Sequence, residues 1–283
     1  MVHATVQRND GWKSRPWLRS VVRNVQGGLV RSGFVVDQDG RFGKGTEAAL
    51  RNFQTQAAVD ATGVADRETW NELEPAIIDA LEQRQPDLTV QLPAFQGDLY
   101  WVHDQEGHSG QPYWPGGKSG VTLDPGVDLG HADPGLVRTA YQPLLSDEQY
   151  AAVEVVCGIK GSEARQALAD NGALQSIRLT RDQAESILPF AARGYWDSVC
   201  NRFRVDRETS LPAIQTVLLS LAYNRGAGNS DLDVLAKPIG EERWTQVADL
   251  VGAMQQSHPL PGIPLRRQAE ANLIRAEIEY LGI

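Results

Sequence analysis

Cysteine is scarce in this 283-residue chain, which contains only Cys157 and Cys200. Two cysteines are too few for a disulfide-stapled scaffold or for a zinc site built from thiolates. No uninterrupted apolar run approaches the roughly 18 residues that a membrane-spanning helix needs. The first residues also lack the apolar stretch and the small-residue cleavage site of a secretory signal peptide. We therefore expect a chain that folds in a reducing cytosol and has no membrane span.

Acidic residues are almost missing from the first 31 positions, where Asp10 is the single acid, although the whole chain carries a net charge of −9. The basic residues of this leading segment are Arg8, Lys13, Arg15, Arg19, Arg23 and Arg31. Such a segment can dock on an anionic surface, but a solvated helix face gives the same pattern and is commoner. We expect the helix face; action on outer membranes is a hypothesis that deletion of residues 1–16 tests.

Apolar residues make up 41% of the chain, which is enough for a packed core and excludes general disorder. From Leu18 to Val30 they recur at intervals of three and four, as on one face of a helix. Turn-rich loops at 37–43 and 60–63 separate this segment from a second helix, expected to begin at Thr46, and from a third. The pattern predicts a three-helix unit of under 60 residues.

The order of residues in this unit is similar to the peptidoglycan-binding domain found at the ends of many cell-wall hydrolases. The matching residues are Val25, Gln26, Leu29, Gly33, Phe34, Asp39, Gly40, Phe42, Gly43, Thr46, Ala49, Phe53, Gln54, Asp60, Gly63, Thr69, Trp70 and Leu73. Most are turn glycines or core side chains, for which we expect structural roles. In this family the second loop usually repeats the first, and residues 60–63 stretch that repeat. The resemblance implies that residues 1–76 bind peptidoglycan.

The rest of the chain is predicted to be mainly helical. Residues 77–97 form a helical linker, and residues 98–283 form a second domain. Capping boxes at Ser146–Gln149 and Thr180–Gln183 indicate where two of its helices begin. The stretch 107–135 is dense in glycine and proline and predicts short strands and turns. The predicted fold class is therefore mainly α: a three-helix domain, then an α+β domain with a small β-hairpin region.

Three residue types in this second domain carry candidate chemistry. Glu106 follows a helical stretch, where apolar neighbours would keep it protonated as a general acid by desolvation. A second carboxylate on a nearby turn would stay ionised and hold water or stabilise an oxocarbenium ion, and a threonine hydroxyl between the two acids could orient the attacking water. Two carboxylates in unlike environments are what glycoside cleavage needs. A Glu–Asp pair alone is weak evidence in a chain with 36 acidic residues.

The order of the motifs makes the case stronger. They are Glu106-Gly107, Tyr113, Gly120-Val-Thr122, Asp128-Leu-Gly130, Ala222-Tyr-Asn224-x-Gly226 and Gly262-x-x-x-Arg266-Arg267-x-x-Glu270. This order resembles the phage-lysozyme superfamily of muramidases, and within it the pesticin-like branch. The resemblance implies a lysozyme-like domain with Glu106 as catalytic acid, Thr122 as the residue that positions water and Asp128 as second carboxylate. It also implies hydrolysis of the β-1,4 bond between N-acetylmuramic acid and N-acetylglucosamine.

One departure from the family adds a third carboxylate, Asp124. The family usually has Thr-Ile-Gly-x-Gly where this chain has Thr122-Leu-Asp124-Pro125-Gly126. Motif spacing favours Asp128 as the second carboxylate and leaves Asp124 as the contender, or as a cap of the turn before Pro125. Inversion would follow if the two carboxylates were roughly 6.5–9.5 Å apart.

Several polar and aromatic residues are candidates for contacts with the sugar chain. The substrate-binding candidates are Tyr113, Asp124, His131, Tyr223 and Asn224. Aromatic faces stack on sugar rings, although such rings also wall cores. For Tyr223 and Asn224, lining the groove and holding the helix against the catalytic loop are equally open. Arg266 and Arg267 are expected to pair with interior acids.

Other chemistries were weighed against the muramidase. A zinc amidase could use His103, His108, His131 and Asp133, but His103 and His108 are five residues apart and no His-Glu-x-x-His motif is present. A lytic transglycosylase needs the glutamate without a water-positioning carboxylate, so Thr122 and Asp128 favour hydrolysis. Wall binding without catalysis is favoured only if Glu106 is dispensable. We expect no metal and no organic cofactor.

A binding module followed by a lytic module, without an export signal, is similar to modular endolysins of phages that infect Gram-negative bacteria. The resemblance implies accumulation in the host cytoplasm and passage to the periplasm through a holin pore. Tethering would raise the effective concentration of the lytic module at the polymer. We expect a monomer whose partner is peptidoglycan and which binds no nucleic acid.

Overall fold

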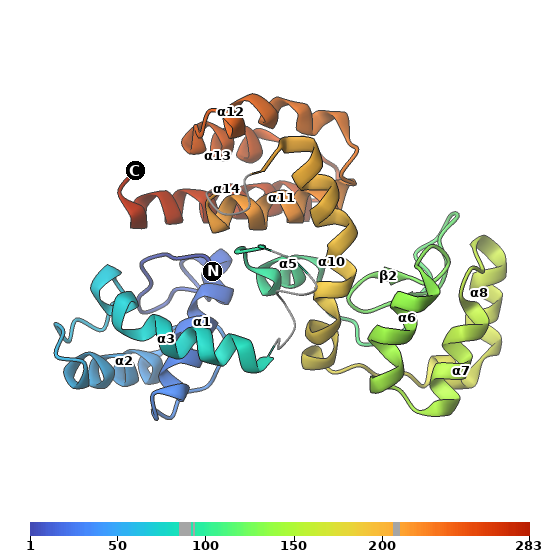
Figure 1. The fold of residues 1–283 in the computed structure, drawn as a ribbon, viewed down its shortest axis with the longest axis horizontal. Helices are drawn as coiled ribbons and strands as arrows, with labels where there is room; N and C mark the ends of the chain where they lie inside the picture. The colour runs from blue at the N-terminus through green and yellow to red at the C-terminus, as the bar shows by residue number, and fades with distance from the viewer. Residues whose placement is uncertain (85–91, 93, 206–209) are drawn as a thin grey trace. The chain divides into compact units, whose positions relative to one another are not determined.

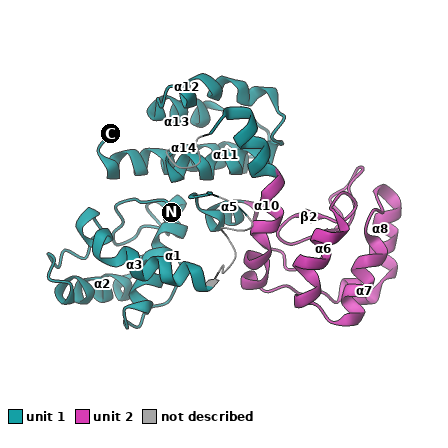
Figure 2. Ribbon diagram, in the orientation of Figure 1, with its two compact units in different colours: residues 1–105, 195–283 teal, residues 106–194 magenta. Residues whose placement is uncertain are grey.

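The computed structural model describes residues 1–84, 92, 94–205 and 210–283. The chain divides into unit 1, Met1–Gln105 with Tyr195–Ile283, and unit 2, Glu106–Gly194 (Figure 2). Helices dominate, and the described strands form one two-stranded antiparallel sheet, so the predicted mainly α fold is confirmed. None of the described helices is both long and apolar enough to cross a membrane.

The elements that lie wholly in unit 1 are helical. They are η1 (Pro16–Leu18), α1 (Arg19–Arg31), α2 (Lys44–Gln56), α3 (Arg67–Arg84), α11 (Pro212–Arg225), η3 (Ser230–Leu235), α12 (Ala236–Gly240), α13 (Trp244–Ala253) and α14 (Gly262–Leu281). Figure 1 shows α11 and α14 side by side, with α12 and α13 beyond them. Two further helices continue from one unit into the other: α5 (Leu99–Glu106) and α10 (Arg181–Phe203).

The first three helices follow the predicted pattern with two differences. Helix α2 begins at Lys44 rather than at Thr46, because Gly43 takes the extended N-cap position. Helix α3 runs without a break through Pro75 to Arg84, so the start of the predicted linker belongs to the third helix. The other linker positions 85–91 and 93 lie outside the described residues.

A buried glutamine holds each of the two loops of this three-helix segment. Gln26 accepts the N–H of Gly40 at 2.8 Å and donates to the threonine hydroxyl of the following helix at 3.1 Å. Gln54 makes the same pair of bonds, to the N–H of Gly63 at 2.8 Å and to the next threonine hydroxyl at 2.9 Å. The loop at 60–63 therefore keeps the hydrogen-bond pattern of the first loop although its sequence is stretched.

The segment before α1 packs against α14 within unit 1. The His3 N–H donates to Glu277 Oε1 at 3.1 Å, and the His3 ring stacks on Tyr280 with centroids 5.4 Å apart. The N–H of Ala213, in α11, donates to Glu277 Oε2 at 2.7 Å. These contacts join the first and last parts of the chain in one unit. This division differs from the predicted domains 1–76 and 98–283, which stay a prediction about functional modules.

Glu277 makes the stability of unit 1 depend on pH. Burial raises the pKa of Glu277 from 4.5 to about 7, against the lowering effect of its bonds from Ala213 and His3. Between these values the folded protein keeps a proton that the unfolded chain has lost, so this contribution to stability falls as the pH rises. We expect the free energy of unfolding to drop by about 3 kcal/mol from this group between pH values of about 4.5 and 7.

Chemical denaturation of the wild type and Glu277→Gln at about pH 5 and about pH 8 checks this expectation. Burial lowers the pKa of His3, so the contribution of His3 to stability rises with pH, opposite to that of Glu277. Because His3 is present in both proteins, its contribution cancels when the two are compared. The wild type should lose about 3 kcal/mol more than the variant over this range. Equal losses in the two proteins would contradict the assignment to Glu277.

Unit 2 contains the short sheet and a ring of helices. Its elements are β1 (Thr122–Leu123), β2 (Val127–Asp128), α6 (Pro134–Tyr141), η2 (Gln142–Leu144), α7 (Asp147–Val156), α8 (Gly161–Asp170) and α9 (Gly172–Gln175). The strands lie in the predicted stretch 107–135. Val121, Leu123 and Leu129 are buried in one apolar cluster with residues of α6 and α7. Side chains alternate between the two faces of a strand, so Thr122 and Asp128 lie on the face opposite this apolar cluster.

Both predicted capping boxes are present. Ser146 and Gln149 exchange side-chain and backbone hydrogen bonds of 3.2 Å at the start of α7. Thr180 and Gln183 do the same at the start of α10, with bonds of 2.8 and 3.2 Å. Each box satisfies N–H groups that the first helical turn leaves without partners, so the sequence signal marks the helix start correctly.

Candidate active site

The hairpin of unit 2 aligns three of the predicted site residues. The N–H of Tyr113 donates to the carbonyl of Thr122 at 3.0 Å, and the N–H of Thr122 donates back at 2.7 Å. Thr122 is also the direct partner of Asp128 across β1 and β2. Residues opposite one another in antiparallel strands point to the same face. The structure therefore places Tyr113, Thr122 and Asp128 side by side, on the face opposite the apolar cluster.

The hydroxyl of Thr122 is a buried polar group that makes no hydrogen bond within the described part of the chain. The residue is 3% exposed. A buried hydroxyl without a partner costs about 1–3 kcal/mol, which a fold rarely retains without a reason. Its place next to Asp128 suits a donor or acceptor that is completed by substrate or by the attacking water.

Asp128 holds the two ends of the hairpin together through one oxygen. Its Oδ1 accepts the N–H groups of Gly120 and Gly130, both at 2.9 Å. A Cβ atom at position 120 would lie 2.6 Å from this oxygen and 2.3 Å from the nitrogen of Gly130, so only glycine fits there. Within the described residues no hydrogen bond reaches the second oxygen, Oδ2. The half-buried carboxylate thus has one oxygen bound by the backbone and one that accepts no hydrogen bond from the described residues.

Asp124 is buried and is held through one carboxylate oxygen. Its Oδ2 accepts the N–H groups of Ser109 at 2.9 Å and Gly110 at 2.6 Å, and lies 2.8 Å from Nδ1 of His108. The Asp124 carboxylate therefore does not cap the turn before Pro125; it binds the loop at 108–110. That loop directly follows Glu106. Asp124 thus fixes the chain beside the predicted catalytic acid.

His108 was missed as a partner of Asp124 in the sequence analysis, which weighed it only as a zinc ligand. The two residues come from separate loops, and no local pattern signals that those loops meet. Their contact orients the imidazole through Nδ1. His108 therefore contacts a buried carboxylate through Nδ1.

Glu106 is the last residue of α5, and Gly107, with φ of +77°, ends the helix. The residue is exposed, so the predicted apolar surroundings are wrong in this structure. Glu106 is one of three carboxylates whose charge affects the pKa of the Tyr113 phenol. That pKa is raised first by partial burial and then by the negative charges of Asp124, Glu106 and Asp128. The negative charges of all three candidate carboxylates therefore act on one phenol.

The remaining sugar-contact candidates are less closely tied to this group. His131 is exposed in unit 2, with Nε2 3.4 Å from the carbonyl of Lys118. Tyr223 and Asn224 belong to the last turn of α11 in unit 1, where the Tyr223 ring stacks on Tyr195 with centroids 4.3 Å apart. A role for these three residues in a sugar groove stays a prediction.

The arginines of the late motif are interior residues, as expected. Arg267 donates to Glu270 Oε1 at 2.8 Å, and Arg266 Nε lies 3.4 Å from the same oxygen. All three are buried in unit 1, and Ser220 of α11 also donates to Glu270 at 2.6 Å. This cluster joins α14 to α11. The late motif around Arg266 and Glu270 therefore has a role in helix packing.

Comparison with known proteins bears on the first part of the chain. Residues 19–73 match the family described as "Putative peptidoglycan binding domain". The peptidoglycan-binding domain predicted within residues 1–76 is thereby confirmed. The matched segment contains both buried glutamines and the loops that they hold. No curated protein matches the chain significantly.

Among solved structures, the crystal structure of the Burkholderia AP3 phage endolysin is similar at 17% sequence identity. The alignment covers 96% of this chain and 100% of that chain, with a TM-score of 0.22. A TM-score this low carries no argument about fold or function, so the candidate site rests on its own geometry.

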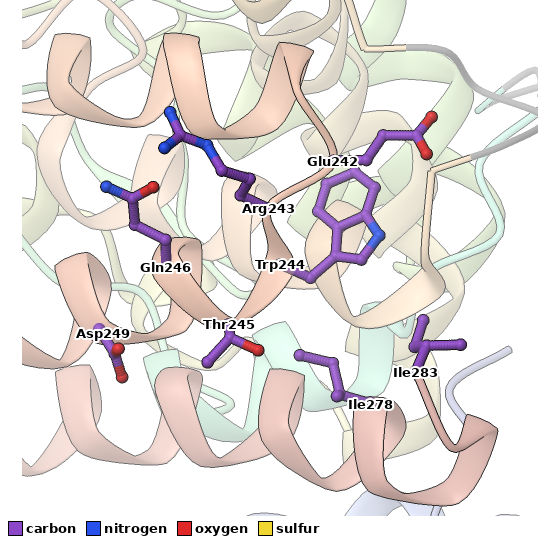
Figure 3. Close-up of a pocket in the computed structure, with 8 residues that line it drawn as sticks. All are labelled: Glu242, Arg243, Trp244, Thr245, Gln246, Asp249, Ile278 and Ile283. Atoms are coloured by element: carbon purple, nitrogen blue, oxygen red, sulfur yellow. The ribbon is translucent and has the colours of Figure 1, made fainter.

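A separate hollow of about 690 Å³ lies on unit 1. Figure 3 shows its lining, which comes from the start of α13, including Arg243, Trp244 and Gln246, and from the end of the chain at Ile278 and Ile283. None of the predicted catalytic or sugar-binding residues lines it. The candidate chemistry thus belongs to the open face of the hairpin in unit 2.

Proposed function

We propose that this chain is a peptidoglycan-lysing muramidase of the endolysin type. It would hydrolyse the β-1,4 bond between N-acetylmuramic acid and N-acetylglucosamine. The observation that carries the proposal is the alignment of Tyr113, Thr122 and Asp128 on one face of the hairpin, where the buried Thr122 hydroxyl has no hydrogen-bond partner among the described residues. The family match of residues 19–73 supports peptidoglycan as the substrate.

Each residue has a role that follows from its position. Glu106 protonates the glycosidic oxygen, and the bound glycan covers the exposed helix end and removes water from it. Asp128, held through Oδ1, uses Oδ2 to hold the attacking water or to stabilise the oxocarbenium ion. Thr122 orients that water through its hydroxyl. Asp124 and His108 fix the loop after the acid and touch no reacting atom in this scheme.

The proposal extends to how the protein reaches its substrate. An endolysin of this kind accumulates in the host cytoplasm as a monomer and enters the periplasm through a holin pore. The peptidoglycan-binding domain keeps the catalytic unit at the polymer, which raises its effective concentration there. No cofactor takes part in the proposed reaction.

The product decides the reaction type. Purified Gram-negative sacculi are incubated with the full-length protein, and the released muropeptides are examined by mass spectrometry. We expect reducing N-acetylmuramic acid ends, because water completes the reaction in a hydrolase. Anhydro-muramic ends would show a lytic transglycosylase. Free peptides with intact glycan strands, lost on addition of a chelator, would show a metal amidase and overturn the muramidase proposal.

A further inference from the structure

Half of the six basic residues in the leading segment form ion pairs in the folded protein. Arg8, Arg15 and Arg31 each form an ion pair with a carboxylate. Lys13 differs from them, because its Nζ lies 4.5 Å from the centre of the Trp12 ring instead. The unusual feature of the segment is therefore one aromatic residue with a cation beside it.

A second cation, from a distant part of the sequence, also lies near the Trp12 ring. The guanidinium of Arg41, in the loop at 37–43, lies 5.9 Å from the same ring. The indole is 48% exposed, although tryptophan gains more than most residues from burial. Within the described chain no carboxylate forms an ion pair with Lys13 or Arg41. We call these three residues the Trp12 platform.

The loops that carry the platform are held together by their backbones. The N–H of Asn9 donates to Phe42 O at 2.9 Å, and the N–H of Phe42 donates to Asp10 O at 3.0 Å. Gly11 has φ of +71°, and a Cβ atom there would lie 2.0 Å from the carbonyl oxygen of Gly40. This close approach holds together, before any ligand arrives, the two loops that carry the ring and the cations. Pre-arranged groups lose less entropy on binding.

An exposed indole flanked by two unpaired cations suits a particular ligand chemistry. The C–H face of a pyranose packs on an aromatic ring, and carboxylates pair with ammonium and guanidinium groups. Peptidoglycan offers both, as N-acetylated sugars that carry peptide carboxylates. We propose that the Trp12 platform binds this anionic glycan and is a wall-contact surface of unit 1. The inference rests on the proposed function, because it takes the wall polymer as ligand.

The platform lies partly outside the matched family segment. Trp12 and Lys13 precede residues 19–73, and only Arg41 belongs to that segment. The binding surface proposed here is therefore built by this chain's own leading loop on the edge of the peptidoglycan-binding domain.

The test is sedimentation of the full chain with purified sacculi, with Glu106→Gln present in every protein so that the polymer stays intact. Trp12→Ala should weaken binding about tenfold, equal to about 1.4 kcal/mol. Trp12→Phe, which keeps an aromatic face, should stay within about threefold of the parent. Binding by the parent tests the proposed function, whereas the difference between variants tests the platform.

A charge-reversed pair tests the two cations. Lys13→Glu with Arg41→Glu should weaken binding at least about tenfold and remove most of its dependence on salt. Lys237→Glu with Arg243→Glu makes the same change in net charge elsewhere on unit 1 and should stay within about twofold. The parent should bind sacculi with chemically amidated carboxylates as weakly as the Lys13/Arg41 variant binds native sacculi.

Two results would overturn the inference. In one, parent, Trp12→Ala and the charge-reversed pair bind sacculi equally while their melting temperatures agree. In the other, the variants keep their affinity for sacculi but lose binding to phosphatidylglycerol vesicles, which would make the platform a membrane contact. Melting temperatures measured on each protein separate lost contacts from lost folding.

Discussion

Glu106→Gln is expected to lower kcat on peptidoglycan by about 10³-fold while the melting temperature stays the same. The amide keeps the size of the side chain but has no proton to give to the leaving oxygen. Glu106 is exposed at the end of α5, so the exchange alters no packing. Release of dye-labelled fragments from sacculi measures the rate, and calorimetry measures the melting temperature.

Glu163→Gln is the matched control, because Glu163 is an exposed acid in α8 of the same unit. It loses one negative charge without touching the hairpin and should keep wild-type activity. If Glu106→Gln retained more than about a tenth of the activity, Glu106 would not be the general acid, since removal of such a group typically costs 10²–10⁴-fold. If the wild type also released no fragments from sacculi, the result would favour a wall-binding protein without catalytic activity.

Helices and their starts could be predicted from the sequence because they depend on neighbours along the chain. The apolar spacing after Leu18 and the Ser146 capping box each involve residues within one or two turns. The β-hairpin could also be placed, since dense glycine and proline limit the stretch 107–135 to turns and short strands. Helix α3 continues through Pro75, so this proline does not end the third helix.

Contacts between distant loops could not be predicted in the same way. His108 meets Asp124, and Lys13 and Arg41 meet at Trp12, only after the loops have been brought together by the fold. No periodic pattern records such a meeting. Family motifs pointed to Asp128 but could not tell that Oδ1 binds Gly120 and Gly130. In Asp128, Oδ1 therefore holds the backbone, and Oδ2 is the atom to which we assign the proposed chemistry.

The exposure of Glu106 is the clearest difference between expectation and structure. The sequence predicts desolvation by apolar neighbours within the protein, whereas Glu106 is exposed at the helix end in the structure. In the proposed reaction, the bound glycan would supply the same physical effect by expelling water from the carboxyl group of Glu106. Desolvation would then depend on the presence of substrate.

Asp124→Ala is expected to lower the free energy of unfolding of unit 2 by about 2–3 kcal/mol, because removal of a buried acceptor leaves its hydrogen-bond donors without a partner. The variant leaves His108 without its carboxylate and the N–H groups of Ser109 and Gly110 without an acceptor. Activity should fall as well, because the loop that follows Glu106 loses its anchor. Denaturant titration measures the first effect and the sacculus assay the second.

Asp124→Asn separates this anchoring role from direct catalysis. The amide oxygen can still accept from Ser109 and Gly110, so we expect most of the stability to return and activity to stay within about tenfold of the wild type. A second catalytic carboxylate would behave differently: its amide variant would fold normally and lose about 10³-fold in kcat. Asp128→Asn is expected to show that second pattern, since Oδ1 keeps its two backbone bonds while the charge on Oδ2 is lost. The opposite outcome, an inert but stable Asp124→Asn and an active Asp128→Asn, would transfer the catalytic role to Asp124.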